Sequence, residues 1–331
     1  MSRELTDAKS RVLQFQAALD AATTGSATSI VCANHLDGAH SYRGVHPFNE
    51  LSGSAALADQ VWSPIKSAMP VLQRRPDIFF AGRHHMQSDG ALWVVSMGHF
   101  LGDWVNPWLG IAPSMKTTFI PYVAWYRIVD NAIVETVEWF DILSVITQAN
   151  RNPYAQHQSA AHIMSPGPLT HDGLLNETQK PEISAKTFDL THAMLTELAE
   201  TMTSPSDHMT QHWHDDMNWF GPAGIGACLG FAGYRRGHTG PFEEKQDFVD
   251  YYDESAATAE GNYAAFLWRP CLGMRNTGDY MGVPSNKVVA EMRVVDVYRR
   301  DGDKLAENWI FIDMLHFIKM QGIDLLSQIR Q

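Results

Sequence analysis

The chain has 331 residues, of which 45% are apolar and 19% charged, enough for two globular domains of ordinary composition. Its formal charge of −12 argues against a nucleic-acid-binding or polybasic membrane-binding surface. The cysteines Cys32, Cys228 and Cys271 form no CxxC pair, and the amino terminus has no apolar secretory region. We therefore expect a cytoplasmic protein with reduced thiols and no nucleic-acid or membrane partner.

The first half, residues 1–150, contains many aromatic side chains and ends in two predicted strands joined at Asp130–Asn131. Aromatic residues on strands usually pack in a core. Some of them should nevertheless face any ligand cavity, where they would favour a small hydrophobic or aromatic substrate. The candidates for such substrate binding are Trp104, Trp108, Tyr122 and Trp139.

Residues 151–183 are rich in Pro, Gly, His and polar side chains, which predicts a linker. The second domain is then expected over 184–331. In residues 184–203 apolar side chains recur every four positions, so we predict a helix that Ser184 caps. A second, short helix is predicted around Asp207–Met217.

Three histidines lie close together at the start of the second domain. His208 and His212 are one helical turn apart, a spacing that can hold a metal ion. The segment lacks the Glu of an HExxH motif, and no third ligand is fixed by spacing, so no metal is predicted. His214 is a candidate for the entrance of a cavity, and Trp219 is a candidate for substrate binding.

Three strands are predicted at the end of the chain, over 263–268, 288–298 and 305–317. The last two are separated by Arg-Asp-Gly-Asp, a hairpin turn signal. Helices followed by a run of long antiparallel strands predict an α+β domain.

The two halves repeat each other at a nearly constant spacing, which predicts a tandem duplication. Identical residues recur 172 positions apart across glycine, tyrosine, carboxylate and leucine positions. The matched pairs are Gly110 with Gly282, Tyr126 with Tyr298, Glu135 with Glu307, Asp141 with Asp313 and Leu143 with Leu315.

Two motifs carry a resemblance to a known family. The segment TGDYMGVPSNK (277–287) resembles the tGefmGipPTGk signature of SnoaL-like proteins, in the NTF2-like superfamily. The segments VETVEWFDIL (134–143) and AENWIFIDML (306–315) resemble the closing strand of that family. The resemblance implies two tandem NTF2-like (cystatin-like) domains, each a curved antiparallel sheet wrapped around helices to form a cone-shaped cavity. It also implies an intrachain pseudo-dimer, with a homodimer of such tandems as the alternative.

The repeated aspartates are the leading candidates for chemistry. If the last strand of each copy continues through them, the period of two places Asp141 and Asp313 on one face with apolar neighbours. In a closed cavity desolvation would raise the pKa of each carboxyl toward neutrality, as a general acid or base requires. The neighbours on these faces include Trp139, Trp309 and Phe311. The alternative is a partly exposed or ion-paired aspartate at the sheet edge.

The family includes polyketide cyclases that close rings by an aldol step without a cofactor, so we expect a cofactor-free enzyme of lyase or isomerase type. Asp141 and Asp313 would transfer protons on a hydrophobic carbonyl compound. His99 would assist the first copy, and Arg275 or Asn276 would polarise the substrate oxygen in the second. The first copy, which has His99 and many aromatic residues, is the first place in which to look for a site. The alternatives are a non-catalytic small-molecule-binding protein and a hydrolase that uses an Asp-activated water.

Overall fold

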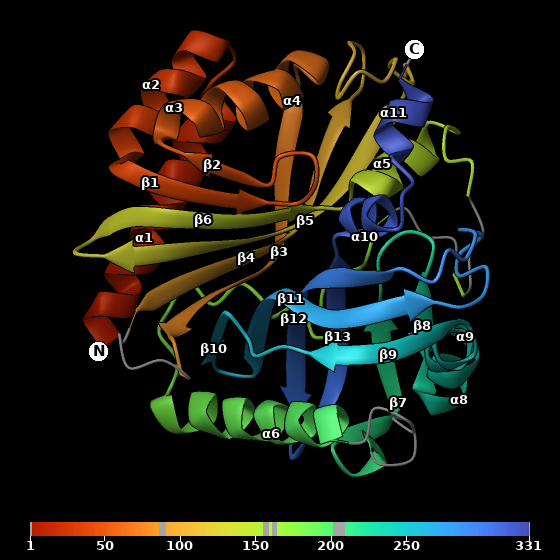
Figure 1. Cartoon of the computed structure of the whole chain (residues 1–331). Helices are drawn as coiled ribbons and strands as arrows, with labels where there is room; N and C mark the ends of the chain where they lie inside the picture. Colours follow the sequence, from red (N-terminus) through yellow and green to blue (C-terminus); the bar gives the residue numbers. More distant parts are fainter. Residues whose placement is uncertain (1, 86–90, 155–158, 161–163, 201–208, 331) are drawn as a thin grey trace.

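The computed structural model describes residues 2–85, 91–154, 159–160, 164–200 and 209–330, and it divides them into two α+β domains (Figure 1). Each domain contains one sheet whose inner face is covered by helices. The expected α+β architecture in two copies is therefore confirmed. None of the helices in the described ranges has the length and apolar character needed to cross a membrane.

The first domain is a six-stranded sheet in the order β2-β1-β6-β5-β4-β3. The strands pair antiparallel except β1 with β6, which run parallel. Its strands are β1 (Leu36–Gly44), β2 (Glu50–Ser52), β3 (Leu72–Arg83), β4 (Leu92–Asp103), β5 (Thr117–Val129) and β6 (Ala132–Phe140). Its helices are α1 (Ser2–Ala21), α2 (Gly25–His35), α3 (Ser54–Leu57), the π-helix η1 (Ala58–Trp62), α4 (Ser63–Ala68) and α5 (Ile142–Gln148).

The second domain repeats this plan, with the sheet order β10-β11-β12-β13-β7-β8 and with β9 paired to β11. Its strands are β7 (Trp213–Phe220), β8 (Ala227–Leu229), β9 (Gln246–Tyr251), β10 (Ala256–Glu260), β11 (Tyr263–Asn276), β12 (Val289–Asp301) and β13 (Lys304–Ile312). Its helices are α6 (Pro181–Glu200), the 3-10 helix η2 (Met209–Gln211), α8 (Gly230–Tyr234), the π-helix η3 (Arg235–Thr239), α9 (Gly240–Lys245), α10 (Met314–Met320) and α11 (Leu325–Ile329).

Local sequence explains the turns and two of the errors in the predicted elements. Asp130 and Asn131 both have positive φ, as a tight type I′ hairpin needs. Helix α6 starts at Pro181, a residue favoured in the first helical turn, so Ser184 lies inside the helix and does not cap it. Of the short helix predicted around Asp207–Met217, residues 207–208 lie outside the described ranges, the 3-10 helix η2 forms at Met209–Gln211, and the rest is wrong because β7 begins at Trp213 and pairs with β13. Pairing in the sheet decides the conformation of this segment.

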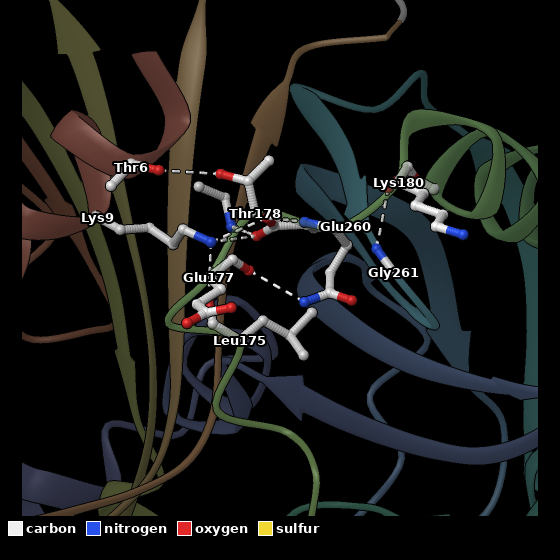
Figure 2. A network of polar contacts seen from close by, with 11 residues as sticks. Thr6, Lys9, Leu175, Glu177, Thr178, Lys180, Glu260 and Gly261 are labelled. Carbon is white, nitrogen blue, oxygen red and sulfur yellow. Dashed lines mark hydrogen bonds and ion pairs between the residues drawn. The ribbon is translucent and has the colours of Figure 1, made fainter. Parts of the chain in front are cut away.

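A buried ion pair joins the two domains. Lys9 of α1 and Glu260 of β10 are 2.9 Å apart, and both side chains are 1% exposed. Glu260 also accepts hydrogen bonds from the backbone N–H of Ala81 in β3 and of Gln179 in the connecting segment. Lys9 donates to the carbonyl of Leu175 (Figure 2). Every oxygen and nitrogen of the pair therefore has a partner, which a buried pair needs to be stable.

The domains also contact through their sheets. The guanidinium of Arg269 in β11 lies 5.8 Å from the ring centre of Trp139 in β6, and its Nη1 donates to the carbonyl of Gly44. The rings of Phe80 in β3 and Tyr263 in β11 stack with centroids 6.4 Å apart. The face of each sheet that turns away from its own helices thus contributes to the contact between domains.

Candidate functional site

The second domain contains a cavity between its sheet and its helices. Its volume is about 140 Å³, roughly ten times the ~10–15 Å³ that one water molecule needs. Strands β11, β12 and β13 form one wall, while α6 and the helices from α8 to α9 form the other. Most of the lining is aromatic or aliphatic, including Trp213, Trp219, Trp268, Phe242, Met292 and Ile310. Such a lining suits an apolar ligand with a few polar groups.

The interior of the first domain is filled by an arginine among aromatic rings. The Arg74 guanidinium lies 4.6 Å from the ring centre of Phe100 and 5.5 Å from those of Trp62 and Tyr122. Asp20 accepts three hydrogen bonds from it. The sequence pointed first to the first copy as the place to look for a site, but the 140 Å³ cavity lies in the second.

Asp296 of β12 is the buried carboxyl of the cavity. It is 6% exposed, and its Oδ1 accepts a hydrogen bond of 2.9 Å from Nδ2 of Asn308 on the neighbouring strand β13. Burial raises the pKa of Asp296 to about 7, although hydrogen bonds from Asn308 and Tyr298 oppose this shift. Near neutral pH the group is therefore divided between its acid and base forms, as a proton-transfer residue requires.

His238 of the π-helix η3 faces the same cavity. Its ring stacks on that of Trp219 with centroids 4.2 Å apart and also contacts Tyr234. Burial lowers the pKa of His238 to about 3, so the imidazole is neutral at physiological pH. Its Nδ1 has no hydrogen-bond partner among the described residues. A neutral imidazole in this position can donate a hydrogen bond to a ligand or accept one from it.

The structure places Asp141 and Asp313 outside this cavity. Each caps the helix that follows it, Asp141 by accepting from Ser144 N–H at 2.9 Å and Asp313 from His316 N–H at 3.2 Å. Each also accepts a hydrogen bond from a loop of the other domain. The prediction that their strands continue through them is wrong, because β6 ends at Phe140 and β13 at Ile312.

The two aspartates join the domains reciprocally. Asp141 Oδ2 accepts from the backbone N–H of Ala223 at 2.8 Å, and Asp313 Oδ2 accepts from that of His46 at 2.9 Å. Both border a space of about 10 Å³ at the junction. Burial does raise the pKa of Asp313 to about 6, against the hydrogen bond from His46 and the charge of Arg293. The raised pKa thus arises at a domain contact, where little room is left for a substrate.

The aromatic residues beside these aspartates face the same way, away from the cavity of the second domain. Trp309 donates its indole N–H to the carbonyl of Pro166 and stacks on Phe220. Trp139 lies under Arg269 of the other domain. Phe311 is buried but does not line the cavity. On β13 the cavity is lined by the alternate positions, Asn308, Ile310 and Ile312.

The remaining candidates of the first domain serve its core and its edge. His99 Nδ1 lies 3.7 Å from an oxygen of Asp77, and its ring is tilted against Phe119. The rings of Trp104 and Trp108 meet edge to face at 6.5 Å. Tyr122 shares a hydrogen bond of 3.0 Å with Ser96 inside the filled interior. The structure therefore does not bring His99 and Asp141 together with these rings around one cavity.

Of the candidates in the second domain, Trp219 lines the cavity. Arg275 lies 3.5 Å from Asp247, and Asn276 is fully buried, where its Nδ2 donates to the carbonyl of Val283. His214 shares a hydrogen bond with the carbonyl of Asp301. Two further histidines belong to the cluster noted in the sequence. His212 pairs with Glu197 at 2.7 Å, and His208 lies outside the described residues. Within the described ranges no group of three His, Cys, Asp or Glu side chains could hold a metal ion.

Sequence reasoning missed Asp296, Asn308 and His238. A signal for the first was present, because Asp296 interrupts the apolar run VVDVY inside a predicted strand. Aspartate is rarely buried without a partner, so a carboxyl in such a run is a candidate for a buried functional group. His238 carries no comparable signal, because only the π-helix turns it toward the sheet.

No protein-family model and no curated protein matches this sequence. Solved structures that resemble it are SnoaL-like and NTF2-like proteins, each about one domain long. A candidate SnoaL-like polyketide cyclase from Jannaschia sp. CCS1 is 18% identical, covers 45% of this chain and 95% of its own, and has a TM-score of 0.34. An NTF2-like protein from Burkholderia xenovorans LB400 is 11% identical over 42% of this chain and 97% of its own, with a TM-score of 0.33. IdmH from Streptomyces antibioticus, a candidate polyketide cyclase, is 16% identical over 40% and 98%, with a TM-score of 0.30.

Proposed function

We propose that the second domain is a cofactor-free enzyme of lyase or isomerase type that transfers a proton on an apolar carbonyl compound, with Asp296 as the acid and base. One observation carries this proposal. Asp296 is a buried carboxyl in the wall of an apolar cavity, and its pKa of about 7 fits both roles near neutral pH. Nδ2 of Asn308 donates a hydrogen bond to Oδ1 of Asp296 and so holds the carboxyl in place.

The proposed reaction needs a base and hydrogen-bond donors. Ionised Asp296 removes a proton from the carbon next to the carbonyl, and the electron pair of the broken C–H bond moves to the carbonyl oxygen. The indole N–H of Trp213 has no hydrogen-bond partner among the described residues and lines the cavity, so it is one donor for this oxygen; neutral His238 is another. If the enolate is conjugated with a C=C bond, Asp296 returns the proton to a different carbon and an isomer forms. Alternatively, the enolate carbon attacks a second carbonyl carbon, and the oxygen of that carbonyl receives the proton of Asp296.

The experiment follows the exchange of the α-protons of 2-tetralone, a neutral bicyclic ketone, for deuterium by NMR. We expect the protein to accelerate exchange, with a rate that rises as pH increases through about 7 because Asp296 must be ionised. Asp296→Asn should lower the protein-dependent rate by about 10²- to 10⁴-fold, the usual contribution of a general base.

The matched controls are Asp141→Asn and Asp313→Asn, which remove the same charge while keeping a residue that caps helices well. Both should retain the exchange rate within about twofold. If instead these variants lose exchange while Asp296→Asn keeps it, the proton-transfer role returns to the aspartates predicted from the sequence. Wild-type protein that binds the ketone without accelerating exchange would favour a binding protein over an enzyme.

A further inference from the structure

A second space lies beside the cavity on the side of α6, and we treat it as the mouth of the cavity because the two share part of their lining. This space has a volume of about 490 Å³ and shares Leu195, Tyr251 and Trp268 with the lining of the cavity. It lies between α6 and the segment that joins β9 to β10. Two adjacent carboxylates of that segment, Asp253 and Glu254, line it. A ligand that passes from solvent to Asp296 along this path meets these carboxylates first.

The charges along the path have one sign. The carboxyl groups that line the cavity and its mouth are Asp253, Glu254, Glu243 and Asp296. Within the described residues no lysine or arginine lines either space, and the basic groups there are the imidazoles of His192 and His238. An anionic ligand would lose its hydration without gaining a cationic partner, which is costly. The negative charge of the whole chain acts in the same direction.

The walls add two features that select a ligand. The faces of indole and phenol rings attract cations, and the cavity and mouth together contain Trp213, Trp219, Trp268, Tyr234, Tyr251 and Tyr298. Trp213 is 1% exposed, and its indole N–H has no hydrogen-bond partner among the described residues. Because Trp213 lines the cavity, this N–H is available to an acceptor oxygen of a ligand there.

We infer that the natural ligand is a ring compound with an acceptor oxygen and a protonated amine, whose apolar body fills the cavity and whose ammonium group lies at the mouth beside Asp253 and Glu254. The inference rests on the proposed function in one respect, because it takes the same cavity as the substrate site. It adds the charge of the substrate, which the proposed reaction leaves open.

The experiment compares three probes that share an indole ring and differ in charge. These are tryptamine, indole-3-acetamide and indole-3-acetate, and their dissociation constants are measured by calorimetry at pH 8, where an ordinary imidazole is neutral. We expect tryptamine to bind most tightly, the neutral amide less tightly and the acid most weakly. The advantage of tryptamine over the amide should be roughly five- to tenfold, the effect of two partly exposed carboxylates. It should shrink as salt screens the mouth.

The double variant Asp253→Asn, Glu254→Gln tests the assignment of the mouth. It should remove the advantage of tryptamine while the amide binds as it does to the wild type. Asp59→Asn changes one exposed charge in the first domain and should leave all three constants unchanged. The inference is overturned if the acid binds as tightly as the amine, if none of the probes binds, or if the double variant keeps the advantage. The exchange of neutral 2-tetralone tests the proposed function separately, so a failure of either one can be recognised.

Discussion

The two domains share one plan of sheet and helices, but the interior of the first is filled and that of the second contains a cavity. Three aromatic residues of the first domain, Phe100, Tyr122 and Phe140, contact one another directly or through a shared ring. The residues 172 positions later are smaller, and all three line the cavity of the second domain. These residues are Leu272, Val294 and Ile312.

The helices show the same difference at a fourth position. Each domain contains a π-helix of five residues, Ala58–Trp62 in the first and Arg235–Thr239 in the second. Trp62 and Thr239 end these segments, and Thr239 lines the cavity. Because protein interiors are close-packed, larger side chains at these four positions, together with Arg74, help to fill the first interior, while smaller ones leave space in the second. The comparison shows that, after a duplication, one domain can have a filled interior while the other retains a cavity.

The largest expected effect comes from opening the first domain. Trp62 is 2% exposed and meets the rings of Phe100 and Phe140 at 5.6 and 6.0 Å. Trp62→Thr, which introduces the residue of the second domain, should lower the free energy of unfolding in urea by about 3–5 kcal/mol because the ring leaves a void. Ile30→Thr is the control, because Ile30 is exposed and its replacement should change stability by less than about 0.5 kcal/mol. A loss below about 1 kcal/mol for Trp62→Thr would show that the first interior tolerates an open space.

The second prediction compares the buried acids of the two domains. Both carboxyl oxygens of Glu138 in the first domain are buried and have no hydrogen-bond partner among the described residues, and burial raises the pKa of Glu138 from 4.5 to about 8. Between these values the folded chain holds a proton that the unfolded chain releases, so stability falls as pH rises from about 5 to 8 and then levels off. The slope is about 1.4 kcal/mol per pH unit.

Glu138→Gln should remove this part of the pH dependence, measured as the free energy of unfolding in urea at several pH values. The pKa of Asp296 is raised from 3.8 to about 7, so this group also makes stability fall as pH rises, and its contribution ends near pH 7. Asp296→Asn should therefore remove the pH dependence of stability between about pH 4 and 7. If Glu138→Gln unfolds with the same pH dependence as the wild type, Glu138 is not held as a neutral acid in the folded chain.

The third prediction closes the second domain. Val294→Tyr introduces the residue that fills the matched position of the first domain, so it should lower 2-tetralone exchange and tryptamine affinity by at least about tenfold. Overpacking should cost no more than about 1–3 kcal/mol of stability, which a urea titration checks. Val288→Tyr places the same side chain nearby on a residue that is 45% exposed, and it should leave both functions intact. Full activity in the Val294 variant would show that this cavity is not the site.

The fold was predictable because its signals are local and repeated. The hairpin at Asp130–Asn131, the apolar spacing in 184–200 and the constant spacing of 172 each act through neighbouring residues or through duplication. The helix predicted around Asp207–Met217 failed because β7 forms by pairing with β13, a strand about 90 residues away. Contacts at such distances in sequence leave little trace in local periodicity.

The candidate site was harder to predict because it depends on where a strand ends. Extending β6 beyond Phe140 and β13 beyond Ile312 made Asp141 and Asp313 look like strand residues beside Trp139 and Trp309. Strand alternation then selected the face opposite the cavity, since one residue of register exchanges the two faces. The aspartates recur because both domains need the same cap and the same cross-domain hydrogen bond. The residues that recur in both copies are thus the ones that support the fold. Asp296 does not recur, because the matched position of the first domain is Ala124, and it belongs to the cavity that only the second domain has among the described residues.

The smallest expected effects concern these two aspartates, at which the domains are alike. Asp141→Ala and Asp313→Ala each remove a helix cap and leave the N–H of Ala223 or His46 without its acceptor. Each should therefore lower the free energy of unfolding in urea by about 1–2 kcal/mol. The corresponding Asn variants keep a capping side chain and should remain closer to the wild type. Because both aspartates border the same small space at the junction, the double Ala variant should depart from additivity. Unchanged stability together with lost 2-tetralone exchange would mean that the repeat preserves a catalytic group and not a domain contact.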